Sequence, residues 1–393
     1  MIRSRLLFAP LLAVLAAPSL MAATPASEAA AAAQAAAEQL RASVGKLDAA
    51  LAADDQVTAL TDVIQGYEQG LAALRAGLRE AAQRETDLRA RFEAQHDRLS
   101  RVLGAMTAMQ QSPETALLLH PGGATATARS AMIVADIAPG LRAEAEALQS
   151  DLNEIAMVRE LQSSAADILG SGLAAVQEAR RLLASAVTDR SHMPVRFSEN
   201  PAELQALEAG AASLDEFAAG VARLDTDVGP PLSDFEGAQG GLPLPVVGTV
   251  VRGYGDADAA GVSRNGMVIA TAPAALVTTP WSASIRFRGP LLDYGNVMIL
   301  EPARGYLLVF AGLGQVFGEV GDVLAAGDPL GLMGGTQPAA QEFGAQFVAD
   351  ATKGGDAGQT QTLYLELRKG RETLDPADWF VVNPVADPRQ GQD

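Results

Sequence analysis

The sequence predicts an α+β multidomain protein, in which an N-terminal antiparallel coiled-coil hairpin is followed by a mostly antiparallel β domain. Alanine and leucine dominate the first half of the 393 residues, whereas glycine, proline, valine and aromatic residues gather in the second. Two long segments of the first half carry apolar residues at alternating spacings of three and four, which is typical of coiled-coil seams. In the second half, short β-like runs alternate with turn residues. The chain is long enough for two or three structural units.

The first residues have the features of a secretion signal. Arg3 and Arg5 supply positive charge, residues 6–15 form an apolar run, and the pair Ala22-Ala23 suits cleavage. The apolar run is short for a bilayer span, which takes about 20 residues. We therefore expect residues 1–23 to be a cleaved signal peptide, with an uncleaved anchor as the alternative.

Composition excludes some classes of function. The formal net charge of -18 makes nucleic acid and anionic lipid poor partners, because both are bound through clustered Lys and Arg. The chain has no cysteine, so no disulfide can form. Its three histidines, His96, His120 and His192, all precede the β domain. We expect a protein or polysaccharide as the partner.

Two seams of similar length define the hairpin. The first runs from Val57 to Met109, with only Glu85 and Gln95 polar at the seam positions, and the second covers residues 141–187. At 1.5 Å per residue the first helix is roughly 80 Å long, which is more than one globular core covers.

Two matching seams in one chain predict an intramolecular hairpin over residues 24–190, with its tip at about 111–139. Pairing the two seams within one chain costs less entropy than recruiting a second chain, which favours the hairpin. A parallel dimer through one of these helices is the alternative. The tip carries more apolar residues than a loop needs. We expect it to be a self-packed cap, a docking surface, or both.

One further amphipathic helix is expected in the linker 191–241. Asn200 suits the N-cap position and Pro201 the first helical position, so the helix should span residues 201–224. It is tethered on both sides and has an apolar face to bury. It should therefore dock, either on the hairpin base or in a groove of the β domain as a removable plug. Its apolar face includes Leu204, Leu207, Leu214 and Val221.

The β domain is expected over residues 242–381, followed by a flexible tail at 382–393. Its pattern predicts a compact antiparallel sheet or a partly closed barrel. A long segment at about 335–360, rich in Gly, Ala, Gln and Asp, interrupts the pattern and could fold against a groove of this domain as an extra wall or helix. The expected strands are 246–251, 267–270, 284–287, 297–300, 306–310 and 362–367.

The β domain carries a series of short motifs: Leu244-Pro245, Gly266-Met267-Val268-Ile269, Tyr294-Gly295-Asn296-Val297, Leu363-Tyr364-Leu365-Glu366 and Asp375-Pro376. In this order they resemble the signatures of the LytM, or M23, peptidoglycan peptidase family. The resemblance covers residues 242–381, and the signal peptide followed by a coiled coil extends it to most of the chain. It implies a LytM-like fold for the β domain.

Active members of this family bind zinc through the His and Asp of a His-x-x-x-Asp motif and the second His of a His-x-His motif. Every corresponding position is substituted in this chain. Zinc needs N, S or O donors, and valine and glycine side chains offer none. The resemblance therefore implies no catalytic residues, no metal and no cofactor, and hence no enzyme. The degenerate ligand positions are Arg264, Val268, Gly312, Thr362 and Tyr364.

Within this family the pattern most resembles the murein hydrolase activators of the EnvC type, which carry similar Gly-Met-Val-Ile and Leu-Tyr-x-Glu-x-Arg runs. That resemblance implies a periplasmic, non-catalytic activator of peptidoglycan (N-acetylmuramoyl-L-alanine) amidases in cell division. The emptied groove would hold a helix of a zinc amidase, and the coiled-coil tip would bind a membrane complex of the FtsEX type. The tethered helix would block the groove, and peptidoglycan would be reached only indirectly.

The same resemblance implies an amidase-binding groove on the strands of the β domain. Tyr364 and Arg368 lie four apart on one expected strand, so we expect them to share a face and to be exposed. Arg368 is the strongest candidate, because its planar head can grip a carboxylate or the carbonyls at a helix C-terminus. Met267, Val268 and Phe310 could instead be core residues. The expected groove residues are Arg264, Met267, Val268, Tyr294, Phe310, Tyr364 and Arg368.

Two other functions stay open. An active M23-type zinc metalloendopeptidase that cleaves peptidoglycan cross-links would need unorthodox ligands such as Asp256, Asp258 or Glu366, although acidic residues near Gly255 also suit a turn. A periplasmic adaptor of an export system also joins a helical hairpin to β modules. Such adaptors insert the hairpin between two halves of a β domain, whereas here no β-like segment precedes the hairpin.

Overall fold

The computed structural model describes residues 25–110, 123–189, 201–224, 234–258, 261–335, 340–353 and 360–382. The expected signal peptide at 1–23, residues 111–122 of the expected tip, Asn200 and residues 383–393 of the expected tail lie outside the described residues. Among the helices that the structure describes, none combines the length and the apolar character that crossing a membrane requires.

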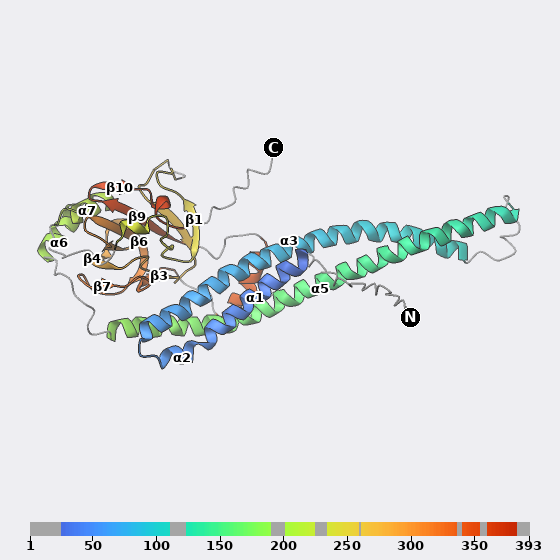
Figure 1. The fold of residues 1–393 in the computed structure, drawn as a ribbon, viewed down its shortest axis with the longest axis horizontal. Helices are drawn as coiled ribbons and strands as arrows, with labels where there is room; N and C mark the ends of the chain where they lie inside the picture. The colour runs from blue at the N-terminus through green and yellow to red at the C-terminus, as the bar shows by residue number, and fades with distance from the viewer. Residues whose placement is uncertain are drawn as a thin grey trace, which may run out of the picture.

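Two long antiparallel helices, α3 (Gln56–Gln110) and α5 (Gly123–Asp189), form a hairpin that extends away from the β unit (Figure 1). Two shorter helices, α1 (Pro25–Gly45) and α2 (Leu47–Leu51), precede them, and α1 packs against both long helices near the hairpin base. A mostly antiparallel sheet follows in the chain. The predicted α+β fold class is therefore confirmed.

The polar positions of the two seams meet inside the hairpin. Glu85 of α3 is only 8% exposed and accepts hydrogen bonds from Arg159 at 3.2 Å and from Gln162 at 3.5 Å, both on α5. Arg89, one turn further along α3, donates to the same carboxylate. Glu85 is buried although the two arginines are largely exposed, so a shift of register would leave its carboxylate without the partners on α5.

Helix α5 begins earlier than the sequence predicts. The described part of the expected tip, residues 123–139, is helical, and Pro139 lies inside α5. Proline removes one intrahelical hydrogen bond and normally breaks or kinks a helix. Pro139 and Gly140 are both exposed here, so α5 carries the proline on its solvent side.

The β unit is a ten-stranded sheet whose ladders between named strands are all antiparallel. The main path runs β1-β2-β9-β6-β5-β4-β7; β10 pairs with β9, and β8 pairs with β3 and β6. Short 3-10 turns lie at Glu236–Ala238, Leu292–Tyr294 and Pro376–Asp378. The strands are β1 (Gly248–Arg252), β2 (Met267–Thr271), β3 (Leu276–Thr278), β4 (Ala283–Pro290), β5 (Asn296–Glu301), β6 (Tyr306–Val316), β7 (Val323–Leu324), β8 (Pro329–Met333), β9 (Gln361–Lys369) and β10 (Glu372–Leu374).

Alternate residues of the central strands enter two separate cores, as the two-residue repeat of a strand requires. Tyr364 of β9 belongs to the core on one face, together with Val268 of β2. The opposite face of the same strands carries the larger core of the β unit, to which β9 contributes Leu363, Leu365 and Leu367.

The single helix expected at 201–224 is instead two helices, α6 (Pro201–Gly210) and α7 (Leu214–Val221). Ser213 caps α7 by accepting from the Glu216 backbone N–H at 3.2 Å, and the Glu216 carboxylate accepts from the Ala212 N–H at 2.9 Å. The bond to Ser213 satisfies one of the first N–H groups of α7, and the bond to Glu216 holds the residue that precedes the cap. The Ser-x-x-Glu spacing at 213–216 is the sequence signal for this break.

The segment at 335–360 contains α8 (Ala340–Thr352), which packs on the hairpin. Phe347 and Ala351 are buried in the same core as residues of α3 and α5, and the Arg75 guanidinium of α3 lies 4.6 Å from the Phe347 ring centroid. The expectation that this segment forms a wall of the groove is therefore wrong. Its apolar side chains Phe347 and Ala351 are instead buried against the hairpin base.

A buried carboxylate of the hairpin base also contacts the β unit. Glu68 of α3 pairs with Arg180 of α5 at 2.7 Å, and the same Glu68 oxygen accepts from the Leu276 N–H of β3 at 2.9 Å. Gln65 of α3 also donates to the Thr278 hydroxyl at 3.2 Å. Since Leu276 itself lies in the hairpin core, the two units share buried contacts.

Candidate partner-binding face

Helix α7 lies over one face of the central sheet (Figure 1). Its apolar side chains are inserted into a cluster of side chains from β2, β4, β5, β6 and β9. We call this part of the sheet the covered face. It is formed by Val268, Phe287, Val297, Ile299, Leu307, Val309, Ala311 and Tyr364.

The contact between α7 and the covered face is mainly apolar. Phe217 is fully buried, and its ring meets that of Phe287 with centroids 4.6 Å apart at an interplanar angle of 69°. Leu214 and Val221, expected on the apolar face of the linker helix, are buried at the two ends of α7, and Leu204 and Leu207 of α6 pack on the same cluster. Burying each large apolar side chain stabilises the contact by roughly 1.5–3 kcal/mol before the ordering of the helix is counted.

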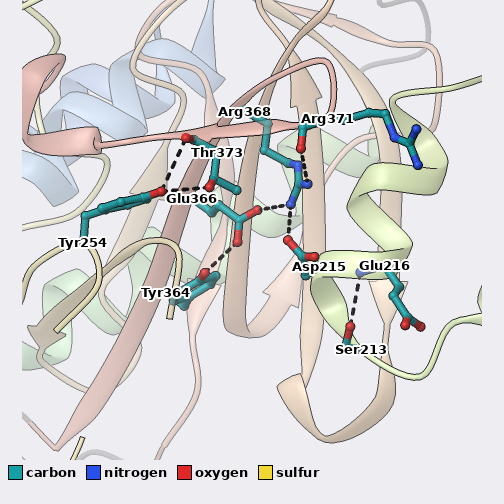
Figure 2. Close-up of polar contacts among 9 residues, drawn as sticks. All are labelled: Ser213, Asp215, Glu216, Tyr254, Tyr364, Glu366, Arg368, Arg371 and Thr373. Atoms are coloured by element: carbon teal, nitrogen blue, oxygen red, sulfur yellow. Dashed lines mark hydrogen bonds and ion pairs between the residues drawn. The ribbon is translucent and has the colours of Figure 1, made fainter. Parts of the chain in front are cut away.

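Arg368 holds the first turn of α7 (Figure 2). Its Nη1 lies 2.6 Å from an Asp215 oxygen of α7 and 2.6 Å from a Glu366 oxygen of β9, and its Nη2 donates to the Arg371 carbonyl at 3.2 Å. Tyr364 donates its hydroxyl hydrogen to the other Glu366 oxygen at 2.6 Å. Tyr364 and Arg368 do share a face, but α7 buries both, so the expectation that they are exposed is wrong.

Burial shapes the charges at this end of α7. Desolvation raises the pKa of Glu366, while the Tyr364 hydroxyl and the Arg368 guanidinium oppose that rise. Burial and the neighbouring Glu366 carboxylate raise the pKa of Tyr364 far above its ordinary value, so its hydroxyl stays protonated and donates. Glu366 is thereby held between two donors and in turn fixes the head of Arg368.

A second arginine holds the last turn of α7. Arg286 of β4 is 2% exposed and pairs with Glu301 of β5, and its Nη2 donates to the carbonyls of Val221 at 3.5 Å and Leu224 at 3.3 Å. The sequence reading missed Arg286. The local sequence gives no clear signal, because Ser284, Arg286 and Arg288 alternate with Ile285 and Phe287, which is also the pattern of a strand with one exposed polar face.

The five substituted ligand positions lie near one another. Val268 and Tyr364 are direct cross-strand partners and both face α7. Gly312 has a φ of 96°, and a Cβ there would come within 2.6 Å of the Thr362 carbonyl oxygen, so the backbone leaves little room for a side chain. Arg264 places its guanidinium 5.6 Å from the ring centroid of Tyr294.

These side chains do not fit a zinc ion. Val268 and Gly312 carry no donor atom, and the Tyr364 hydroxyl is committed to Glu366. Within the described ranges, no group of three or more His, Cys, Asp or Glu residues could hold a metal ion.

The unorthodox ligands considered above are engaged elsewhere. Asp256 accepts from the Gly253 N–H at 2.8 Å, and Asp258 accepts from the Val262 N–H at 2.9 Å, so both stabilise turns. Glu366 is bonded to Tyr364 and Arg368.

Two of the expected groove residues do not lie on the covered face. Met267 and Phe310 are 1% and 0% exposed and belong to the core on the opposite side of the sheet. Met267 directly precedes Val268 on β2, and consecutive strand residues point to opposite faces. On a regular strand, Met267 and Val268 could therefore not line the same groove.

The cover that α6 and α7 provide is incomplete. Asp215 keeps 54% of its side chain exposed although Arg368 beneath it is buried. Beside it lies an open pocket of about 460 Å³ between the two helices and the β9–β10 turn. Its lining includes Leu207, Asp215, Arg223 and Arg371.

Comparison with known proteins finds sequence similarity over part of the chain. No known protein-family profile matches this chain. An uncharacterized protein of Neisseria meningitidis serogroup B is 25% identical over 146 residues, which span 37% of this chain and only 21% of that protein.

Several solved structures are similar to part of the chain. The catalytic domain of the prophage-encoded M23 protein EnpA from Enterococcus faecalis is 15% identical, with 33% of this chain and 89% of that chain covered and a TM-score of 0.26. The catalytic domain of lysostaphin from Staphylococcus simulans is 18% identical, with 33% and 89% covered and a TM-score of 0.26. The SpoIIQ-SpoIIIAH pore-forming complex contains a chain that is 19% identical, with 35% and 90% covered and a TM-score of 0.27.

Proposed function

We propose that this chain is a non-catalytic activator of peptidoglycan (N-acetylmuramoyl-L-alanine) amidases, a murein hydrolase activator of the EnvC type that acts in cell division. The observation that carries the proposal is the covered face, where side chains unfit for zinc stand at the ligand positions and a short helix lies over them. A surface that holds one amphipathic helix by an apolar contact and by its two ends is suited to hold another. The proposed occupant is a helix of a periplasmic zinc amidase.

In this proposal α7 is an inhibitory plug. An amidase helix and α7 would compete for the same apolar side chains, so binding of the amidase requires α7 to leave. The exposure of Asp215 and the pocket beside it support such an exchange, because a competing helix can approach from this side.

In this proposal the hairpin controls when α7 leaves the covered face. We propose that its tip binds a membrane complex of the FtsEX type and that residues 1–23 direct export to the periplasm. Helix α3, with 55 residues, places the tip roughly 80 Å from the hairpin base. The Glu68–Arg180 pair, through the Leu276 N–H, and α8 connect that base to the β unit. A movement of the hairpin would therefore also displace groups of the β unit.

The test uses purified protein, a zinc amidase and isolated sacculi. The chain alone should release no peptidoglycan fragments, and the mixture should release far more than the amidase alone. Metal-dependent release by the chain alone, with stoichiometric zinc in the purified protein by mass spectrometry, would overturn the proposal in favour of an M23-type metalloendopeptidase. Specific capture of an outer-membrane channel without any effect on the amidase would favour an export adaptor.

A further inference from the structure

We infer that the covered face selects its partner helix by length, because two buried arginines, Arg368 and Arg286, contact opposite ends of the helix that lies between them. The expected partner is a helix of about two turns with a carboxylate in its first turn and a free C-terminal end. This inference rests on the proposed function, since it specifies the chemistry of the partner at the same face.

Arg368 recognises the start of the helix. Its Nη1 is shared between Glu366 of the sheet and Asp215 of α7, so one of its charge-assisted contacts comes from the bound helix. Asp215 lies in the first turn of α7, where a carboxylate also interacts favourably with the helix dipole. A partner without an acidic side chain at this place would leave a buried guanidinium with a missing contact.

Arg286 recognises the end of the helix. It donates to the carbonyls of Val221 and Leu224, in the last turn of α7 and just beyond it, and the Val221 carbonyl also accepts from the Leu224 N–H at 3.1 Å. A cation is favourable there because the C-terminal end of a helix carries partial negative charge. In a helix that continued past this point, the backbone of the next turn would occupy the place from which Arg286 reaches these two carbonyls.

The distance between the two arginines is set by the sheet. Glu366 holds Arg368 and is itself bonded to Tyr364, whereas Glu301 holds Arg286 and accepts from the Gly305 N–H at 3.2 Å. All four charged side chains are buried, so neither arginine can move far without leaving a charge unpaired. The two guanidinium groups are therefore held at a fixed distance from each other. We call this pair, Arg368 and Arg286, the ruler.

The resident helix matches this ruler. Asp215 and Val221 are six residues apart, which is roughly 9 Å along a helix axis. Between them Phe217 and Ala218 fill the apolar centre of the covered face. A helix with two further turns is roughly 11 Å longer and cannot place both its carboxylate and its end on the two arginines.

The test uses the full-length chain with seven helix-forming residues inserted after Ala219, which lengthens α7 by about two turns and keeps its apolar stripe within roughly 20° of its original phase. Hydrogen exchange should then show loss of protection in α7. A matched control carries the same seven residues after Gly210, in the break between α6 and α7, where the spacing from Asp215 to Val221 is unchanged. Protection of α7 should persist in this control.

Synthetic peptides then measure the selectivity directly. A labelled peptide of residues 201–224 is added to the full-length chain with the lengthened α7, alongside peptides carrying the insertion at either position. The peptide with the insertion after Ala219 should bind roughly tenfold to a hundredfold more weakly than the other two, which is the range for one charge-assisted hydrogen bond. Equal affinities for all three peptides would overturn the ruler.

A double variant, Arg286→Met with Glu301→Gln, removes the second arginine without leaving Glu301 charged and unpaired. In this host the long and short peptides should bind equally. Persistent discrimination would exclude Arg286 as the element that senses the helix end. No amidase is present in these experiments, so failure of the ruler and failure of amidase activation are separate results.

Discussion

Two short helices, α7 and α8, are held in the molecule by different kinds of contact. Helix α8 places Phe347 and Ala351 in the core of the hairpin, so its contact is apolar and enclosed. Helix α7 also buries apolar side chains, but both of its ends are held by arginines, and Asp215 at one end is half exposed. Because Arg286 and Arg368 are buried, only the half-exposed Asp215 end of α7 is open to water, and the bond at that end is the one for which water can compete. The difference suggests that α8 is a permanent joint and α7 a removable cover.

Breaking the buried contacts of Glu68, which connect the hairpin base to the β unit as α8 does, should have the largest effect on stability. Replacement of Glu68 by alanine leaves Arg180 buried without its carboxylate and removes the acceptor of the Leu276 N–H. We expect a loss of about 3–5 kcal/mol in the free energy of unfolding, measured by urea denaturation followed by circular dichroism. The control is Glu178→Ala, which breaks an exposed pair with Arg181 and should leave the urea midpoint unchanged. Equal urea midpoints for the two variants would show that the buried contacts of Glu68 do not stabilise the chain.

The apolar part of the joint can be tested separately. Phe347→Ala removes a ring that is buried between α8 and the hairpin and lies against Arg75. We expect a loss of about 3 kcal/mol in the free energy of unfolding and a wider distribution of hairpin-to-sheet distances by spin-label measurements. Phe343→Ala, at a half-buried position of the same helix, should give a smaller loss. A distance distribution as narrow as that of the unmodified chain would mean that α8 does not fix the two units.

The same substitution in the cover should act locally. Phe217→Ala removes the ring packed on Phe287 and should weaken docking of α7 by about 2 kcal/mol. We expect faster hydrogen exchange in residues 214–221 and tighter binding of the amidase, with little change in the unfolding of the hairpin. If the free energy of global unfolding falls as much as it does for Phe347→Ala, α7 is part of the permanent core and is not a removable cover.

The smallest effect is expected at the exposed end of the cover. Asp215→Asn keeps the shape of the side chain but removes the charge that Arg368 contacts, while Glu366 remains as its partner. Because Asp215 is half exposed, we expect docking of α7 to weaken by only about 1 kcal/mol. Exchange in the first turn of α7 should rise modestly. Glu208→Gln on the exposed side of α6 provides the control and should change nothing.

The parts of the fold that follow from regular repeats could be predicted from the sequence. The two seams specify the hairpin, and their polar positions at Glu85, Arg159 and Gln162 meet as pairing requires. The break at Ser213 was also encoded, as a short capping signal inside an apolar repeat that continues across it. The position of α8 was not encoded locally, because its two phenylalanines would suit any apolar surface of the molecule.

The candidate site was predicted only in part, for a physical reason. Strand β2 is buried at every position, so no alternation of polar and apolar residues tells which side faces α7. This is why Met267 and Val268 were both expected in one groove although only Val268 lies there. Arg286 escaped notice because its partners, Glu301 and the end of α7, are distant in sequence.

The central claim is that a removable helix covers the surface that binds an amidase. The most direct test is the affinity of a zinc amidase for the full-length chain and for a variant that lacks residues 198–226, with unfolding of the hairpin as the check that both are folded. We expect markedly tighter binding by the variant, because the covered face is then free. Equal affinities would show that α7 does not compete with the amidase and would contradict the account.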